Sequence, residues 1–158
     1  DVVKIDASMK IKGGLTMETF CDYFMNPPPN SMEMIEEVKT LEDKGPTEKV
    51  MYWRFKMPMM SARDVCISIK VTDQEDGKFF VVETVNRPEQ PPKDGVVRCF
   101  MFTRGFIRPN KESPADTLDY TELSVFNMGG YMPARLLNMV IASETAKDSG
   151  NMYKHLTK

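Results

Sequence analysis

Residues 64–85, DVCISIKVTDQEDGKFFVVETV, decide the fold predicted for this chain. Between Val65 and Val71 every second residue is aliphatic, and this period of two is typical of a strand with one buried face. Asp76-Gly77 is a hairpin-turn sequence, and Phe79–Val85 provides the strand that returns. The segment therefore predicts an antiparallel hairpin whose first strand covers Asp64–Thr72.

Further strands are predicted on both sides of this hairpin. They cover residues 2–11, Ile35–Leu41, Lys49–Lys56, Gly95–Arg108 and Thr117–Asn127, and Gly105 is expected to form a bulge. Residues 33–42 also fit a short helix, and the strand is favoured because a turn at Gly45-Pro46 and another strand follow. The proline-containing stretch Asn86–Asp94 is predicted to be a loop. Strands joined by hairpins form antiparallel sheets with one buried face, so we expect a curved sheet of about seven strands.

Two helices are predicted, one near each end of the chain. Thr16 is a suitable N-cap for a helix over Met17–Met25. After Gly129-Gly130 the apolar residues change to helical spacing, and a long helix follows Pro133. The pattern blurs at Asp148-Ser149-Gly150 and resumes for one or two turns as far as Leu156. The apolar side chains expected to face the sheet are those of Met132, Leu136, Leu137, Val140 and Ile141. Residues 1–158 are thus predicted to form a single α+β domain with a cavity between sheet and helix.

Composition narrows the range of functions. The 158 residues are 41% hydrophobic and 28% charged with a net charge of −2, so bulk electrostatic binding to nucleic acid is not expected. The 3 cysteines lie far apart without metal-ligand spacing, which is typical of reduced thiols in an intracellular protein. The only histidine, His155, argues against most metal sites and Ser-His-Asp triads. We expect no metal, no cofactor and no membrane span.

Methionine is unusually frequent, with 14 residues. Its flexible thioether side chain suits an apolar surface that must adapt to its partner. The segment Met57-Pro58-Met59-Met60 stands out, because three methionines are an unexpected choice for an exposed turn. We expect this loop to close over the cavity as a lid and to dip into a membrane surface.

Four segments resemble a known family in the order that the family has them. They are YWRFKMPMMSARD (52–64), NRPEQPPKDGVVR (86–98), GFIRP (105–109) and the stretch 127–137, which contains GGYMPARLL. Together they resemble the START (StAR-related lipid transfer) domain family, and locally they are most similar to its phosphatidylcholine-transfer branch. The chain is shorter than a usual domain of this family, so we expect N-terminal elements to be missing.

The resemblance implies a helix-grip fold, in which a curved antiparallel sheet wraps around a long C-terminal helix and encloses an apolar tunnel. The tunnel would hold one lipid, with a glycerophospholipid as the first choice and a sterol or ceramide as alternatives. The protein would transfer this lipid between membranes and would not be an enzyme. We expect a cytoplasmic monomer that contacts membrane surfaces transiently and does not bind nucleic acid.

The resemblance to this family also suggests which residues bind the lipid. In the phosphatidylcholine-transfer branch aromatic side chains surround the quaternary ammonium, and Trp53 and Phe102 match two of these positions. Arg98 shares one face of its predicted strand with Phe102, and on a tunnel-lining face it would meet a phosphate. The side chains expected along the acyl region are Val65, Ile67, Val82, Leu136 and Val140, and those of the lid or docking loop are Met57, Met59 and Met60.

Two alternatives remain open at this point. Arg54 is a further candidate for the lipid head group, although strand alternation places it opposite Trp53. The same fold could also form an enzyme such as a polyketide cyclase, for which the candidate acids or bases are Glu83, Glu122 and Tyr120. A third reading is an interaction module that holds a partner protein in the groove.

Overall fold

A computed structural model describes residues 2–28 and 31–158, apart from the side chains of residues 140 and 144. The helices are α1 (Met17–Met25) and α2 (Ala134–Leu156). The strands are β1 (Val2–Lys10), β2 (Ile35–Asp43), β3 (Glu48–Phe55), β4 (Arg63–Gln74), β5 (Gly77–Thr84), β6 (Val97–Arg98), β7 (Phe100–Pro109) and β8 (Thr117–Asn127). The predicted hairpin, both helices and the order of the elements are therefore confirmed.

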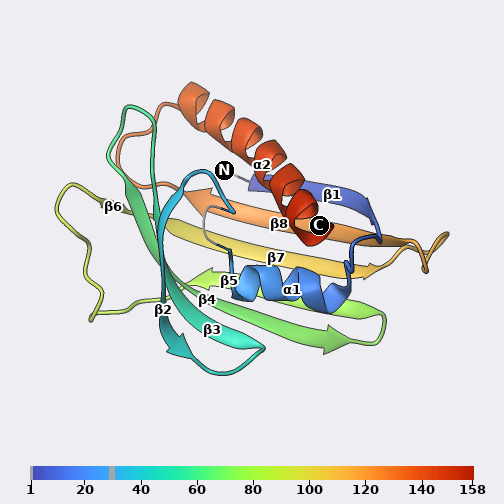
Figure 1. Cartoon of the computed structure of the whole chain (residues 1–158). Helices are drawn as coiled ribbons and strands as arrows, with labels where there is room; N and C mark the ends of the chain where they lie inside the picture. Colours follow the sequence, from blue (N-terminus) through green and yellow to red (C-terminus); the bar gives the residue numbers. More distant parts are fainter. Residues whose placement is uncertain (1, 29–30) are drawn as a thin grey trace.

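The strands form one curved sheet with both helices on the same face (Figure 1). The order is β1-β8-β7-β5-β4-β3-β2, and neighbouring strands in this path are antiparallel. The N-terminal strand β1 therefore closes one edge by pairing with β8, the last strand of the chain. A curved antiparallel sheet around a C-terminal helix is the predicted helix-grip arrangement.

The predicted strand Gly95–Arg108 is divided into β6 and β7 at Cys99. The short β6 leaves the main path and pairs in parallel with the beginning of β4, opposite Arg63 and Asp64. The backbone amide of Cys99 then donates a hydrogen bond to the carbonyl oxygen of Asp64 at 2.8 Å. The prediction of one continuous strand is wrong here. Residues 97–99 form their backbone hydrogen bonds with the start of β4, whereas the later residues of β7 pair with β5.

Gly105 also differs from the prediction, since β7 keeps an unbroken register with β5 and β8 across it. Gly105 lies opposite Phe80, and a Cβ atom at this position would stand 1.9 Å from the phenyl ring. The missing side chain lets the Phe80 ring cross the neighbouring strand, so close packing and not a bulge requires the glycine.

An aromatic cluster attaches α1 to the sheet. The Phe24 ring stacks on Phe80 at a centroid distance of 5.1 Å, and Phe20 lies 4.8 Å from Tyr120. Phe80 and Tyr120 stack on each other at 6.0 Å across β5 and β8. The helix begins with a capping box in which Thr16 and Thr19 exchange side-chain to backbone hydrogen bonds. Helix α1 is thereby fixed over the middle of the sheet.

Two buried charged residues at the start of β4 link distant segments. The Arg63 side chain, 2% exposed, donates to the carbonyl oxygens of Met128 at 3.0 Å, Ser61 at 2.6 Å and Gly129 at 3.3 Å. Asp64, fully buried, accepts from Arg98 Nε at 2.7 Å and from the Tyr52 hydroxyl at 3.2 Å. Burial, followed by the charge of Asp64, raises the pKa of Tyr52 to about 12. Arg63 thus holds the segment that leads into α2.

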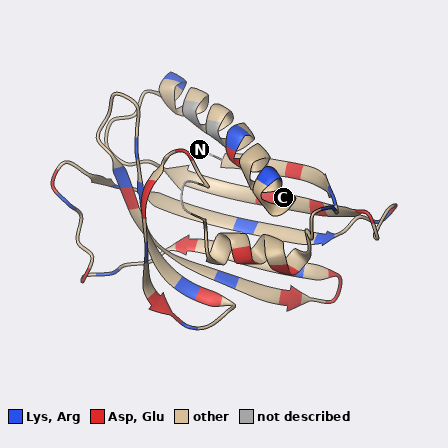
Figure 2. Ribbon diagram, in the orientation of Figure 1, with Lys and Arg blue, Asp and Glu red and all other residues tan. Residues whose placement is uncertain are grey.

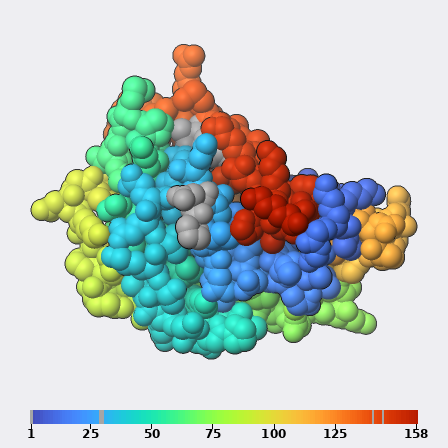
Figure 3. Space-filling view, in the orientation of Figure 1, coloured from blue at the N-terminus to red at the C-terminus, as the bar shows by residue number. Residues whose placement is uncertain are grey.

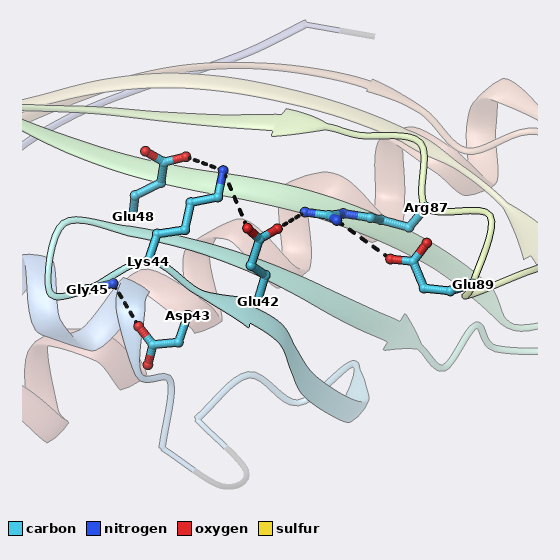
Figure 4. A network of polar contacts seen from close by, with 7 residues as sticks. All are labelled: Glu42, Asp43, Lys44, Gly45, Glu48, Arg87 and Glu89. Carbon is cyan, nitrogen blue, oxygen red and sulfur yellow. Dashed lines mark hydrogen bonds and ion pairs between the residues drawn. The ribbon is translucent and has the colours of Figure 1, made fainter.

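Charged residues of both signs are interspersed along the strands (Figure 2). Figure 4 shows one surface network, in which Arg87 of the 85–96 loop contacts Glu42 of β2 and Glu89. The same network continues through Lys44, whose ammonium lies 2.9 Å from a Glu48 carboxylate oxygen. Such solvent-exposed ion pairs contribute little stability, about 0–1 kcal/mol each. Their effect here is to hold the predicted loop Asn86–Asp94 beside β2.

Replacing Gly105 with alanine should destabilise the fold by about 1–3 kcal/mol, because the new methyl group overlaps the Phe80 ring. A second substitution, Phe80→Leu, should recover part of this loss, so the double variant should unfold more easily than the parent by less than the sum of the two single effects. Urea unfolding of the four proteins measures the difference.

The control is Gly150→Ala in α2, where a Cβ atom meets nothing within 4 Å. This variant should be as stable as the parent or up to about 1 kcal/mol more stable, because alanine favours helix. Strict additivity of the Gly105 and Phe80 effects would contradict the packing explanation.

Candidate ligand cavity

A cavity of about 240 Å³ lies between the sheet and the two helices. Strands β3, β5, β7 and β8 form its floor, and residues of α1 and α2 form its roof. In the space-filling view α2 and the segment before β2 lie over this side of the molecule (Figure 3). The lining is mostly apolar, as shown by Phe24, Phe55, Phe80, Met101 and Met152.

Strand β3 follows the predicted alternation. Trp53 and Phe55 line the cavity, with their rings in edge-to-face contact at a centroid distance of 6.3 Å. Arg54 points to the other face, where its guanidinium forms ion pairs with Glu36 at 3.2 Å and Glu37 at 3.3 Å. Of the two head-group candidates on this strand, the structure brings only Trp53 to the cavity.

Strand β7 turns its odd-numbered residues inward. Met101 and Thr103 line the cavity, as does Cys99 just before the strand. Phe102 lies on the opposite face, covered by the Arg104 guanidinium at 5.1 Å from its ring centroid. The predicted pairing of Phe102 with Trp53 across the cavity is therefore not formed, because even-numbered positions of β7 face outward.

Arg98 also lies outside the cavity lining. Besides its contact with Asp64, Arg98 donates from Nη2 to the Gln90 carbonyl oxygen at 2.9 Å. The hydrogen bond to Asp64 raises the pKa of the Arg98 guanidinium. Its charge is thus used to hold β6 and the 85–96 loop and is not directed at a ligand.

The residues expected along an acyl chain are divided between the wall and the layer beneath it. Val82 lines the cavity, whereas Val65 and Ile67 are fully buried in the core and lie outside the lining. Leu136 is half-buried and does not line the cavity, and the side chain of Val140 lies outside the described residues.

Helix α2 lines the cavity with the continuation of the predicted face, beginning at Ile141, and not with the turns around Leu136. Its lining residues are Ile141, Thr145, Asp148, Ser149 and Met152, which recur every three or four positions. Sequence reasoning missed the polar members of this set, because the search followed the apolar residues near the start of the helix. The helical spacing of Thr145, Ser149 and Met152 from Ile141 is the signal that could have found them.

A polar cluster stands on the floor of the cavity where β7 and β8 meet. The Tyr120 and Ser124 hydroxyls both donate to the Glu122 carboxylate, and the Ser124 and Thr103 hydroxyl oxygens lie 2.8 Å apart. Burial, reinforced by the neighbouring Glu122 charge, raises the pKa of Tyr120 well above its usual value. Tyr120 therefore remains a hydrogen-bond donor at neutral pH. Glu122 and Tyr120, two of the candidate acids or bases, thus lie together, whereas Glu83 is exposed.

The Cys99 thiol in the wall is not an activated nucleophile. Burial raises its pKa to about 12, so almost no thiolate is present at neutral pH. Among the residues that the structure describes, no three His, Cys, Asp or Glu side chains come together as metal ligands.

The methionine loop divides its side chains between the cavity and solvent. Met57 is 5% exposed and lines the cavity, whereas Met59 is 96% exposed. Met59 has a positive φ of 56°, a conformation that turns the chain sharply at the tip. Met60 is half-buried, so its exposure lies between those of Met57 and Met59. Within the described ranges, neither helix is long and apolar enough to cross a bilayer.

Comparison with known proteins identifies relatives of this architecture. A family model of the START domain matches residues 24–158. Human STARD10 superposes with a TM-score of 0.76 and 17% identity, over 97% of this chain and 62% of that one. Human StAR-related lipid transfer protein 5 gives a TM-score of 0.72 and 20% identity, over 98% and 73% of the two chains.

A STAR-related lipid transfer protein from Xanthomonas axonopodis gives a TM-score of 0.79 and 19% identity, over 98% of this chain and 86% of that one. No curated protein matches the chain. At these identities the likeness to solved structures shows the fold alone. The chain spans less than two thirds of the STARD10 chain that it matches.

Trp53 is the only tryptophan in the chain, so its fluorescence reports on the cavity wall alone. A fatty acid carrying bromine in its chain should quench this emission when it enters the cavity, because bromine quenches only on contact. The unbrominated fatty acid is the matched control and should leave the intensity much less affected. Full emission at saturating, demonstrably bound brominated probe would place the ligand elsewhere.

Proposed function

The chain belongs to the START domain family, and from this membership we propose that it binds one lipid molecule in the cavity and transfers it between membranes. The observation that carries the proposal is the mostly apolar cavity that the sheet and helix α2 enclose together. A groove for a partner protein would be open along its length, whereas this cavity has helices above its strand floor.

The physical basis of transfer is replacement of one apolar environment by another. Each methylene group of a lipid chain loses about 0.8 kcal/mol of favourable free energy when it enters water. Side chains such as Phe24, Phe80 and Met152 offer the chain a similar environment inside the protein. The protein thereby lowers the barrier to exchange without an energy source.

Membrane contact is proposed at the loop between β3 and β4. Met57 on the inner side and Met59 on the outer side connect the cavity wall to the solvent. Tyr131, 85% exposed, precedes α2, and Figure 1 shows its segment at the same end of the sheet as this loop. Opening of the loop against α2 would let a lipid pass while Met59 rests in the bilayer surface.

The proposed setting is the cytoplasm, with the protein acting as a monomer. The three cysteines Cys21, Cys66 and Cys99 are buried free thiols, which suits a reducing compartment. Burial raises the pKa of Cys21 to about 11 and also raises the pKa of Cys66, so these thiols are chemically quiet.

The expected preference for a glycerophospholipid has weaker support than the binding itself. Two of the three head-group contacts assigned to it, Phe102 and Arg98, lie outside the cavity lining. Trp53 remains as the aromatic residue that a head group would meet.

The test of lipid binding is extraction. The purified protein, incubated with vesicles made from a total lipid extract and separated by gel filtration, should carry lipid in a one-to-one ratio. Native mass spectrometry of the protein fraction measures the ratio and the lipid mass. Absence of stoichiometric lipid after repeated incubation would reject the proposed function.

Replacing Met59 and Met60 together with aspartate should slow lipid exchange between vesicles several-fold, because apolar insertion at the bilayer surface is lost. Equilibrium binding of lipid should change little, since these side chains lie outside the cavity lining. Aspartate is also well tolerated at positive φ, so the tip of the loop should keep its conformation.

Met57→Asp is the matched comparison, because it places the same charge inside the cavity wall. This variant should lose equilibrium binding itself. Equal transfer rates in the Met59/Met60 variant and the parent would exclude a docking role for the tip of the loop.

A further inference from the structure

We propose that Met59, at the tip of the loop between β3 and β4, is an oxidation site: peroxide converts its thioether to a sulfoxide, and the loop then no longer docks on a membrane. The inference rests on the proposed function, because it concerns control of the docking loop. It makes no assumption about the class of lipid that the protein carries.

The methionines of this chain differ widely in their access to solvent. Met59 is 96% exposed and Met139 is 60% exposed, whereas Met57 and Met152 in the cavity wall are 5% and 6% exposed. The remaining methionines are buried or half-buried. A peroxide dissolved in water reaches an exposed sulfur atom directly, but it reaches a buried one only when the surrounding structure opens. Met59 should therefore be oxidised before any other methionine.

The backbone conformation gives a second reason to single out Met59. Its φ of 56° is the one positive φ outside glycine among the residues that the structure describes. A turn position with positive φ favours glycine or asparagine, so methionine is a sterically costly choice here. Leucine or phenylalanine would supply an apolar surface for docking equally well. The property that methionine adds, besides flexibility, is reversible oxidation.

The thiols of the chain do not compete for the peroxide. Cys21, Cys66 and Cys99 are buried, and burial raises the pKa of Cys21 to about 11 and that of Cys99 to about 12. Peroxide reacts with the thiolate, which is scarce at neutral pH when the pKa is this high. A thioether carries no proton and needs no ionisation before it reacts. The Met59 sulfur is thus the first reactive sulfur that peroxide meets.

The reaction needs only the side chain and hydrogen peroxide. A lone pair of the Met59 sulfur attacks one peroxide oxygen, so that a sulfur–oxygen bond forms while the oxygen–oxygen bond breaks. The departing oxygen takes up a proton and leaves as water. The sulfur loses two electrons to the peroxide, and methionine sulfoxide reductases with a thiol reductant reverse the change.

The sulfoxide changes docking without changing the cavity. Its oxygen is a polar acceptor that water satisfies, and it finds no donor among lipid chains, so insertion of the loop tip becomes unfavourable. Met57 keeps its thioether because it is buried, and the apolar lining therefore remains as it was. Oxidised protein should retain its bound lipid but exchange it slowly.

Peptide mapping tests the site itself. The purified protein is treated with limiting hydrogen peroxide, the peroxide is removed with catalase, and trypsin peptides are analysed by mass spectrometry. Fragment spectra distinguish Met57, Met59 and Met60, which share one tryptic peptide. Sulfoxide should form first at Met59 and next at Met139. Earlier oxidation of Met139 or of a buried methionine would overturn the assignment.

A transfer assay tests the effect on docking. Each protein is compared with itself before and after limiting peroxide, by the rate at which it moves radiolabelled lipid from vesicles of a total lipid extract to phosphatidylcholine vesicles. Peroxide should slow the parent several-fold, and sulfoxide reductases with dithiothreitol should restore its rate. Met59→Leu should keep the rate that it had before peroxide. Met139→Leu, the matched control, removes the other exposed methionine and should slow as the parent does.

The outcomes separate the inference from the proposed function. Equal slowing of Met59→Leu and the parent, or an unchanged rate in parent protein that carries Met59 sulfoxide, would overturn the switch and leave lipid transfer intact. Parent protein that transfers no lipid before peroxide would reject the proposed function and the switch with it. The peptide map decides the oxidation site in every case, because it is recorded without lipid.

Discussion

The burial of Arg63 is the constraint on which the position of the roof helix over the cavity depends. A guanidinium that is 2% exposed needs acceptors close by, and here the backbone carbonyls at positions 61, 128 and 129 accept from Nη1, Nε and Nη2. Two of these carbonyls belong to the segment that leads from β8 into α2. Asp64, next to it, fixes β6 through Arg98. The start of β4 therefore determines where the roof helix begins, and the sheet and the helix enclose a space because this polar centre ties them together.

The alternation of side chains along each strand then determines which residues line the cavity. The sequence predicted these residues correctly only for strands with one clearly apolar face. For β3 the alternation of Trp53 and Arg54 was sufficient. For β7 it was misleading, because the strand carries large aromatic residues on its outer face. The guanidinium groups of Arg104 and Arg108 lie over Phe102 and Phe106 at 5.1 and 5.8 Å, so arginine side chains cover this apolar surface. An outer face protected in this way looks like a core face in the sequence.

The elements themselves were largely predictable, since hairpin turns, the Thr16 cap and the double glycine before α2 mark their boundaries locally. The polar residues of the cavity were not, because their significance depends on tertiary placement. Nothing local distinguishes Glu122 from the exposed Glu83. Tyr120 and Glu122 come to line the cavity, with Ser124 bound beside them, only when β8 pairs with β7 and α2 lies above the strands. The division of the strand at Cys99 has the same origin, since it arises from pairing with a segment 34 residues earlier in the chain.

The pairing of β1 with β8 has a consequence for biosynthesis. Val2 lies opposite Val125, so β1 is synthesised more than a hundred residues before its partner strand exists. Synthesis proceeds at about 5–20 residues per second, which leaves this edge and the apolar floor open for several seconds. Helix α2 (Ala134–Leu156), which is made after all of these strands, contributes the roof over the floor. A nascent chain at this stage exposes the apolar floor that α2 covers in the finished fold.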